Sequence, residues 1–355
     1  MPAPAPSILV IRRRYLGDIV LLGSVLRNLR LHWPHARLAV LVEARFADVL
    51  ALNPDVDAPL LLPTRVRAWP GFVRQLRRAR FTHVFDFDNN ERTALLARLS
   101  GAPFRATVWH EGARPRWPRC YTHRIHDPPA VHERRPITEY YLALLAAAAV
   151  PVVSREVRLV PRAADHDEAR RLLARLFPAP APAGIRSLLV HPGSRSACRL
   201  WPLDRFARIC DRVQDDLGAR VALVAGPGER ALVDEIGRQA RRPPAVVEAV
   251  LPLPHLAALA CRFDALLCHD SGPMHLAAAV GTRVVALLGS QNPALFAPPG
   301  EGHTVLQPPL PCPHCVAPGE CVPGDSYRNY CIRNLAEDHV FAALRARLGR
   351  PAPLP

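Results

Sequence analysis

The sequence contains no lysine, because all 46 of its basic residues are arginines. It also has no apolar run near the roughly 20 residues that a membrane-spanning helix needs. Its first residues alternate proline and alanine, without the basic and apolar regions of a signal peptide. We therefore expect a cytoplasmic protein. Abundant arginine, alanine and proline are typical of a GC-rich genome, so the missing lysine itself says little about function.

The length and composition of the chain favour neither a disordered protein nor a single compact core. The chain has 355 residues, of which 49% are hydrophobic and 22% charged, which predicts two globular domains. Its net charge of +15 is uneven, with 28 arginines against 16 acidic residues in 1–177 and 18 against 15 in 178–355. An anionic partner of the first half would explain this excess, and so would a scattered, solvated basic surface.

Short apolar runs alternate with segments of helical periodicity along most of the chain. Ile8 to Ile11 is such a run, and apolar residues then recur at helical spacing from Ile19 to Leu29. We expect strands at 8–11, 38–42, 60–62, 83–87, 187–190, 221–224, 265–268 and 284–288. We expect helices at 19–29, 47–52, 72–80, 93–99, 137–149, 165–177, 203–217, 229–240, 254–261, 273–280 and 336–348. This alternation predicts parallel sheets covered by helices.

Two segments interrupt the alternation. Residues 101–136 are rich in arginine, histidine and proline, and we expect an irregular, exposed region that faces a substrate. Residues 178–184 alternate proline and alanine, which is typical of a stiff linker. We therefore place an N-terminal domain at 1–177 and a C-terminal domain at 185–355.

The first candidate site follows the first strand, at Tyr15-Leu16-Gly17-Asp18. Gly17 allows a tight turn, and Asp18 lies near the start of the next helix. Ligands of doubly wound sheets bind at the carboxyl ends of the strands, so Asp18 is a candidate general base. The alternative is a helix N-cap, which contributes about 1 kcal/mol at such positions.

The second candidate site is the loop from His191 to Pro202, which follows the first strand of the second domain. It combines glycine with hydroxyl groups and two arginines, among them Ser194 and Arg199. Hydroxyl and guanidinium donors suit a diphosphate whose leaving oxygen gains charge. A polar surface loop is the alternative, because the loop has no Walker spacing.

The third candidate site runs from Cys268 to His275. A strand ends there, Ser271 and Gly272 turn, and a helix begins whose free N–H groups suit a phosphate. His275 adds a hydrogen-bonding group or packs against the sheet. Glu229 ends the equivalent turn of the neighbouring strand, where it suits ribose hydroxyls, although an acid is favourable at any helix N-terminus.

Taken together, these motifs resemble glycosyltransferase family 9, the lipopolysaccharide heptosyltransferases. The resemblance spans nearly the whole chain. It depends on Ile8 to Arg30 with Leu16-Gly17-Asp18, on the His191-Pro192-Gly193 loop ending in Arg199-Leu200-Trp201-Pro202, and on Asp270 to Ala279 with Gly281-Thr282 and Leu288-Gly289-Ser290.

The resemblance implies an α/β fold of GT-B type, in which two Rossmann-like domains face each other across a cleft. The first domain would bind the acceptor and the second the nucleotide sugar. The implied transfer is inverting and needs no metal and no cofactor. Asp18 would deprotonate the acceptor hydroxyl, which attacks the anomeric carbon of the donor.

The resemblance also implies roles for the loops of the second domain. Arg199 stands where such proteins often carry lysine, which keeps the charge but not the geometry. It would stabilise the leaving diphosphate, Glu229 would contact the ribose, and the other donor residues are Ser194, Asp270, Ser271, Gly272 and His275.

A DxD triplet holds a divalent metal in a different glycosyltransferase architecture, and Asp86-Phe87-Asp88 has that form. Here the triplet ends a strand of the first domain, away from the nucleotide loops. The resemblance therefore places Asp86 and Asp88 on the acceptor side with Gly17, and we expect no metal there.

The resemblance implies ADP-heptose as donor and an anionic glycolipid, such as lipopolysaccharide core, as acceptor at the inner-membrane surface. We expect a monomer that binds no nucleic acid and lies in the cytoplasm or peripherally on the inner face of that membrane. Another donor or acceptor is an alternative within the family. A nicotinamide-dependent dehydrogenase is disfavoured because no G-x-G-x-x-G follows the first strand. A nucleic-acid binder would explain the basic first half but not the loops of the second.

Four of the nine cysteines cluster near the end of the chain, at Cys312, Cys315, Cys321 and Cys331. The first pair has the spacing of zinc ligands, whereas the later gaps are irregular. A structural metal or disulfide pairing is one interpretation. The other is a set of ordinary reduced thiols, which we also expect for the remaining five.

Overall fold

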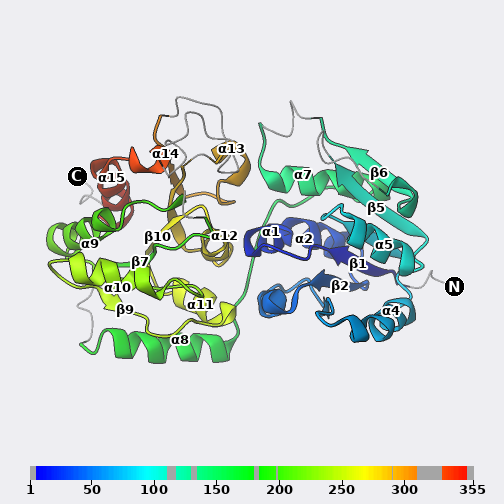
Figure 1. Ribbon diagram of the computed structural model, residues 1–355, viewed down its shortest axis with the longest axis horizontal. Helices are drawn as coiled ribbons and strands as arrows, with labels where there is room; N and C mark the ends of the chain where they lie inside the picture. Colours follow the sequence, from blue (N-terminus) through cyan, green and yellow to red (C-terminus); the bar gives the residue numbers. More distant parts are fainter. Residues whose placement is uncertain are drawn as a thin grey trace. The chain divides into compact units, whose positions relative to one another are not determined.

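The structure, a computed structural model, describes residues 5–109, 117–128, 134–179, 184–196, 199–289, 291–309 and 330–349. The chain divides into two compact units, Met1–Val160 and Pro161–Pro355. Each unit contains one six-stranded parallel sheet with helices packed on it (Figure 1). Within the described ranges, no helix is long and apolar enough to cross a membrane.

The first sheet has the strand order β3-β2-β1-β4-β5-β6, and all of its pairs are parallel. Its strands are β1 (Ser7–Ile11), β2 (Arg37–Val42), β3 (Ala58–Leu61), β4 (His83–Asp86), β5 (Phe104–Trp109) and β6 (His123–His126). Its helices are α1 (Leu16–Leu21), α2 (Gly23–His32), α3 (Ala47–Leu50), α4 (Trp69–Arg78), α5 (Glu91–Leu99) and α7 (Ile137–Ala143). Four 3-10 turns join them: η1 (Ala44–Phe46), η2 (Val66–Ala68), η3 (Pro118–Cys120) and η4 (Leu144–Ala148).

One face of this sheet is covered by α4 and α5. Leu9 of β1 packs there with Phe72 and Leu76 of α4 and with Leu96 of α5, all of them buried. Phe72 and Leu76 are four residues apart and therefore lie on the same side of α4. The polar positions of α4 consequently point away from the sheet.

The structure corrects the prediction that residues 101–136 are irregular. Within this range β5 and β6 extend the sheet from β4, and residues 110–116 and 129–133 lie outside the described part. The strand β6 has the sequence His-Arg-Ile-His and lies at the sheet edge, where three of its four side chains are exposed. An edge strand needs no apolar alternation, so periodicity alone missed it.

The second sheet has the strand order β12-β11-β10-β7-β8-β9, again with every pair parallel. Its strands are β7 (Ser187–His191), β8 (Arg220–Leu223), β9 (Ala245–Val246), β10 (Ala265–His269), β11 (Arg283–Leu287) and β12 (Thr304–Leu306). The helices are α8 (Ala163–Leu176), α9 (Leu203–Leu217), α10 (Arg230–Gln239), α11 (Leu253–Ala260), α12 (Gly272–Ala279), α13 (Pro293–Phe296), α14 (Tyr330–Arg333) and α15 (Glu337–Leu348).

Both faces of the second sheet are covered. Buried residues of α9, α10 and α15 pack on one face, around Val190 and Leu267. Buried residues of α8, α11 and α12 pack on the other, around Leu189 and Leu266. When its strands are counted from β7, this sheet has the same doubly wound order as the first.

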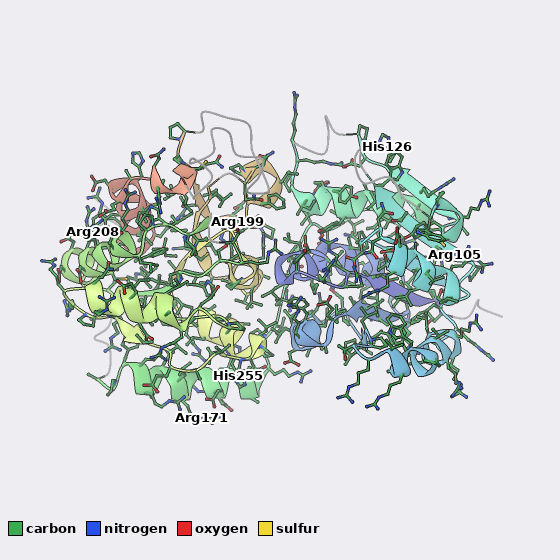
Figure 2. All side chains as sticks on the ribbon, viewed as in Figure 1. Arg105, His126, Arg171, Arg199, Arg208 and His255 are labelled. Atoms are coloured by element: carbon green, nitrogen blue, oxygen red, sulfur yellow. The ribbon has the colours of Figure 1, made fainter. Side chains whose placement is uncertain are left out.

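The helix α8, which we expected in the first domain, belongs to the second unit. Ala169 and Leu172 of α8 are buried in the same cluster as Ala258 and Leu259 of α11. Its outer face is charged, and Arg171 is labelled there in Figure 2. Apolar packing therefore places the division between units at Val160, before this helix. Residues 180–183 of the expected linker lie outside the described part.

Candidate functional site

In both sheets the first and fourth strands are neighbours, while the connections of the two strands lead toward opposite edges. Open α/β sheets bind ligands at this switch point, outside the carboxyl ends of the two strands. In the first unit the switch point lies between β1 and β4, and in the second between β7 and β10. All three candidate loops of the sequence fall at these two places.

The turn after β1 is made by a different residue from the one we expected. Tyr15 has φ 71°, a left-handed conformation that a bulky residue rarely adopts, whereas Gly17 lies inside α1. Strained residues of this kind concentrate at functional sites. Tyr15 is also the N-cap of α1, and no side chain caps this helix, so Asp18 is not an N-cap.

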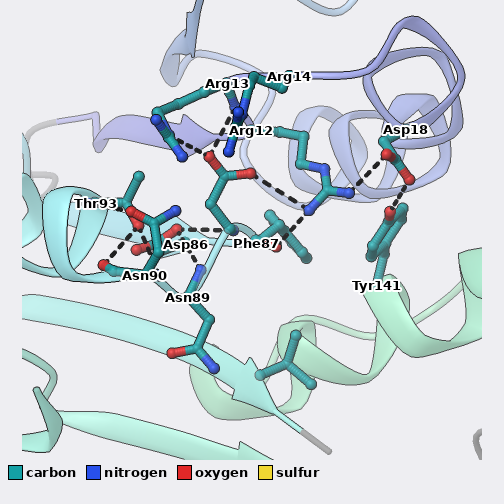
Figure 3. Close-up of polar contacts among 12 residues, drawn as sticks. Arg12, Arg13, Arg14, Asp18, Asp86, Phe87, Asn89, Asn90, Thr93 and Tyr141 are labelled. Atoms are coloured by element: carbon teal, nitrogen blue, oxygen red, sulfur yellow. Dashed lines mark hydrogen bonds and ion pairs between the residues drawn. The ribbon is translucent and has the colours of Figure 1, made fainter. Parts of the chain in front are cut away.

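Both carboxylate oxygens of Asp18 are held by other side chains (Figure 3). Arg12 Nη2 lies 2.7 Å from Asp18 Oδ2, and Tyr141 Oη donates to Asp18 Oδ1 at 2.7 Å. Burial raises the pKa of Tyr141 well above its usual value, so this hydroxyl stays protonated and remains a donor. The Asp18 side chain nevertheless keeps 19% of its surface exposed, which leaves it accessible to a substrate.

Arg12 connects Asp18 to the end of β4. Its Nη1 donates to the carbonyl of Phe87 at 2.8 Å and lies 3.4 Å from Asp88 Oδ1. Burial alone would lower the pKa of Arg12, but Tyr141, Asp18 and Asp88 outweigh burial and raise it. The guanidinium is therefore a permanent positive charge between two carboxylates.

Asp88 is engaged by two arginines. Its Oδ2 accepts from Arg13 Nε at 2.6 Å and from the Arg13 backbone N–H at 3.2 Å, in addition to the contact with Arg12. Only 8% of its side chain is exposed. Asp88 thus positions two guanidinium groups beside β1, and these contacts occupy its carboxylate.

Asp86 is fully buried and stabilises the turn after β4. Its Oδ1 accepts from the backbone N–H groups of Asp88 and Asn89, and its Oδ2 accepts from Tyr121 Oη at 2.7 Å. Asn89 has φ 45°, so this strand end also contains a left-handed residue. Burial, reinforced by the neighbouring Asp88, raises the pKa of Asp86 to about 6. Asp86 is therefore enclosed by protein groups rather than directed to the surface.

Sequence reasoning did not single out Arg12, Arg13 and Tyr141, whose side chains contact Asp18 or Asp88. The two arginines belong to a run of three directly after a buried strand, which is a detectable signal. Tyr141 lies 123 residues after Asp18 along the chain, in α7. No local pattern connects them, because their contact arises only when α7 folds beside α1.

In the second unit, Glu229 lies against the loops that follow β7 and β8. Its Oε2 accepts from the Gly226 N–H at 2.8 Å and lies 3.3 Å from His191 Nε2. A Cβ added to Gly193 would lie 2.0 Å from the Glu229 carboxyl carbon, so a side chain at this position would displace the Glu229 carboxylate. Burial, the largest single influence, would raise the pKa of Glu229, but the hydrogen bond and charge of His191 together with the hydrogen bond from Gly226 outweigh burial and lower it.

His269, the last residue of β10, fixes the loop that follows β7. Its Nε2 accepts from the Trp201 N–H at 2.8 Å, and its Nδ1 lies 3.4 Å from the Gly193 carbonyl oxygen. The ring is fully buried, and burial lowers its pKa to about 3. It is therefore neutral at physiological pH, with Nε2 as acceptor and Nδ1 as donor.

Two hydroxyl groups at this switch point are buried without a partner in the described part of the chain. The Oγ atoms of Ser194 and Ser271 form no hydrogen bond with any of the described residues. Ser271 is the N-cap of α12, followed by Gly272 and Pro273 in the first turn, and His275 is buried one turn into the same helix. Buried unpaired hydroxyls are costly, and beside free helix N–H groups they indicate a site for an anionic ligand.

Arg199 and Asp270 join the two loops directly. Arg199 Nη1 lies 3.0 Å from Asp270 Oδ2, and both side chains are largely buried. Arg199 is labelled in Figure 2, beside α12 and the end of β10. The structure thus joins Arg199 of the second candidate site to Asp270 of the third.

The cysteine cluster falls mainly outside the described part of the chain. This is true of Cys312, Cys315 and Cys321, whereas Cys331 is a buried residue of α14. In the ranges that are described, no three His, Cys, Asp or Glu side chains are grouped as a metal site.

Two doubly wound sheets, with a held carboxylate at one switch point and anion-binding features at the other, form an α/β chain of the GT-B glycosyltransferase type. The chain belongs to glycosyltransferase family 9 (heptosyltransferase), whose family model matches residues 69–322.

The relatives among known proteins are distant in sequence, but the similarity covers most of the length of both chains. The chain is 23% identical to lipopolysaccharide heptosyltransferase 3 of Escherichia coli, over 80% of this chain and 84% of that protein. It is 22% identical to the lipopolysaccharide core heptosyltransferase OpsX of Haemophilus influenzae, over 82% of this chain and 81% of that protein.

Solved structures show the same fold. A family 9 glycosyltransferase from Veillonella parvula matches with a TM-score of 0.84 and 22% identity, over 98% of both chains. The E. coli ADP-heptose lipopolysaccharide heptosyltransferase II matches with a TM-score of 0.76 and 20% identity, over 96% of this chain and 98% of that one. The E. coli heptosyltransferase WaaC, solved with ADP, matches with a TM-score of 0.73 and 17% identity, over 96% and 99%.

Proposed function

We propose that this glycosyltransferase transfers a heptose from ADP-heptose onto a lipopolysaccharide core or a related glycolipid, with inversion and without a bound metal. The observation that carries the proposal is the Asp18 carboxylate, held at both oxygens yet partly exposed at the switch point of the first sheet. The names of the relatives, which are lipopolysaccharide heptosyltransferases, support the choice of sugar and acceptor.

In the proposed reaction, Asp18 accepts the proton of an acceptor hydroxyl as its oxygen attacks the anomeric carbon of the donor. The new carbon–oxygen bond forms while the bond to the diphosphate breaks, and ADP leaves with the bonding electrons. Arg12 and Tyr141 hold the carboxylate in one orientation, so that an accessible lone pair faces the acceptor. Asp88 and Asp86 act through Arg12. They hold the end of β4, where the Phe87 carbonyl and Asp88 contact the Arg12 guanidinium.

The second unit would bind the ADP moiety. The hydroxyls of Ser194 and Ser271 and the first N–H groups of α12, from Gly272 onward, would bind phosphate oxygens, with His275 in the same turn. The guanidinium of Arg199, oriented by Asp270, would stabilise the charge that develops on the leaving phosphate.

Glu229 would bind the ribose. It follows β8, the second strand of its sheet, and an acid after the second strand binds ribose hydroxyls in the related dinucleotide-binding folds. Its contacts with His191 and Gly226 fix the carboxylate against the loop after β7. The same contacts hold the carboxylate where a side chain at position 193 would meet it.

A family 9 enzyme with another nucleotide sugar or another acceptor is the second candidate. The loops of the second sheet support binding of a diphosphate, but they do not identify the sugar attached to it. The relatives favour ADP-heptose: WaaC has been solved with ADP-2-deoxy-2-fluoro heptose, at a TM-score of 0.70 to this chain.

The test is the release of nucleoside diphosphate from a panel of nucleotide sugars, with and without an extracted glycolipid acceptor. We expect ADP release that depends on the acceptor, withstands a chelator of divalent metals, and is lost in Asp18→Ala. Asp48→Ala is a matched control, because Asp48 is an exposed aspartate in the first turn of α3.

Acceptor-dependent release of nucleoside diphosphate from a different nucleotide sugar would show that ADP-heptose is not the donor. It would not contradict the proposed mechanism. Sensitivity to the chelator would contradict the metal-independent transfer. Full activity of Asp18→Ala would contradict the proposed base.

A further inference from the structure

Residues 58–85 contain six arginines and no acidic residue. We call these arginines the α4 basic face, since they lie on η2, on α4 and just after α4, and all six are exposed: Arg65, Arg67, Arg74, Arg77, Arg78 and Arg80. The sequence alone shows the run of charge. The structure places all six at exposed positions along η2, α4 and the residues that adjoin them.

The packing of α4 fixes the direction of these side chains. Phe72 and Leu76 are buried against the sheet. Arg74, Arg77 and Arg78 occupy positions i, i+3 and i+4 of the same helix, so they cluster on one side of it, away from the core. The basic face is therefore a rigid feature of the fold.

None of the six arginines forms an ion pair with a carboxylate of the described residues. Arg77 donates only to the carbonyl oxygen of Leu99 in α5, at 3.3 Å, a contact that places α4 beside α5. The basic face carries six positive charges that no side chain of the described part neutralises.

Arginines on the exposed helices α8 and α9 are paired with carboxylates. Arg171 of α8 lies 2.7 Å from Glu168, and Arg208 of α9 lies 2.6 Å from Glu337; both arginines are labelled in Figure 2. The α4 basic face thus differs from α8 and α9 in having no carboxylate partner among the described residues.

Two exposed aliphatic side chains accompany the charge. Val66, between Arg65 and Arg67 on η2, is 86% exposed, and Leu95 of α5 is 54% exposed. Figure 1 shows α4 and α5 within the first unit, and Arg98 of α5 is exposed as well. An exposed aliphatic side chain between unneutralised arginines, as at Val66, matches the boundary between lipid headgroups and acyl chains.

We propose that the α4 basic face docks the enzyme onto a bilayer that contains anionic phospholipids. The inference rests on the proposed function in one respect, since docking there brings the first unit to the surface that holds a glycolipid acceptor. RNA is the other polyanion that six arginines could bind. Single-stranded nucleic acid is bound largely by base stacking on aromatic groups, whereas Trp69 is only partly exposed and packs edge-on against Phe72 at 5.7 Å.

The test is co-sedimentation of the full chain with vesicles of phosphatidylcholine alone and with about one third phosphatidylglycerol, at roughly 0.1 M salt. We expect binding to the anionic vesicles only. Each arginine near such a surface contributes a factor of about five in partitioning. The triple variant Arg74→Ala/Arg77→Ala/Arg78→Ala should therefore partition about 100-fold more weakly.

The matched control is Arg170→Ala/Arg171→Ala/Arg175→Ala on α8. It removes the same net charge from an exposed helix, but its arginines are paired with Asp167 and Glu168. We expect its partitioning to fall by less than about fivefold, because these charges are already neutralised. A second variant, Val66→Asp, should weaken vesicle binding while leaving the arginines in place.

An equal loss in both triple variants would overturn the proposal, because net charge alone would then explain binding. Equal binding to neutral and anionic vesicles would also overturn it. So would binding to single-stranded RNA that is lost in the α4 triple variant while that variant still binds vesicles. Vesicle binding requires no turnover, so its result is independent of the result of the transferase assay. Unchanged ADP release by the α4 triple variant on detergent-dispersed acceptor is the expected companion result.

Discussion

Arg12 offers the sharpest test of the first site, because one side chain joins Asp18 to Asp88. In Arg12→Met, the 2.7 Å contact with Asp18 and the 3.4 Å contact with Asp88 are lost. Removing one partner of a buried ion pair costs about 3–5 kcal/mol. Because Arg13 still binds Asp88 at 2.6 Å and the Asp18 side chain is 19% exposed, we expect a smaller loss of about 2–3 kcal/mol.

The loss should appear in the first unit. Amide hydrogen exchange of β1 and β4 measures the stability of that unit separately, which one global unfolding transition of a two-unit chain does not. Arg12→Lys keeps the charge but not the planar fork, so we expect about half the loss. Arg45→Met is the matched control, since Arg45 pairs with Glu43 at 2.9 Å on the surface, where ion pairs contribute about 0–1 kcal/mol.

Arg12→Met should also lower kcat by about 10- to 100-fold, because Asp18 then retains only the hydrogen bond from Tyr141. Donor affinity should not change, since Arg12 belongs to the first unit. Protection of β1 and β4 within about 0.5 kcal/mol of the wild-type value, together with an unchanged kcat, would refute the reasoning.

Three further predictions concern the second unit. Ser271→Ala should weaken ADP binding by about 10- to 100-fold in calorimetry without loss of stability, because its buried hydroxyl has no partner in the described part of the chain. Gly193→Ala should lower the free energy of unfolding by about 1–2 kcal/mol, and less in a Glu229→Ala background, because the new Cβ would displace the Glu229 carboxylate from its hydrogen bond with the Gly226 N–H. His269 takes up no proton in the folded state until its pKa of about 3, so wild-type stability should fall by about 4 kcal/mol more than that of His269→Gln as pH drops from 6.5 to 3.

Each of these has a control or a contrary result. Ser100→Ala removes a buried hydroxyl that does bind protein, the carbonyl of Ala97 at 2.7 Å, so it should cost stability and leave ADP binding unchanged. Equal penalties for Gly193→Ala in both backgrounds would contradict the clash with Glu229. Parallel pH profiles of the wild-type protein and His269→Gln would contradict a buried, neutral histidine.

The sequence predicts most of the fold because apolar runs and helical periodicity mark buried strands and the inner faces of helices. It fails at β6, an edge strand with three of its four side chains exposed, and at β5, which lies inside a segment whose overall composition suggested an irregular region. It also assigned α8 to the first unit, since the Pro/Ala segment suggested a later boundary than the packing of α8 on α11 supports.

The site shows the same division between local and long-range information. The loops at Asp18, Ser194 and Ser271 were identified because strand, turn and helix follow one another along the chain. Tyr141 was missed because its contact with Asp18 spans 123 residues, and no local pattern encodes such a distance. For Asp86, the sequence placed the carboxylate at a strand end, but only the packing shows that it is enclosed.

The central claim is that Asp18 accepts the proton of the acceptor, and single-turnover transfer by Asp18→Asn tests it most directly. Asparagine keeps the size of the side chain and can still accept the hydrogen bond from Tyr141, but it cannot take up the proton. We predict transfer about 100- to 10,000-fold slower than in the wild-type protein, with the dissociation constant of ADP unchanged. Transfer within tenfold of the wild-type rate would contradict the account.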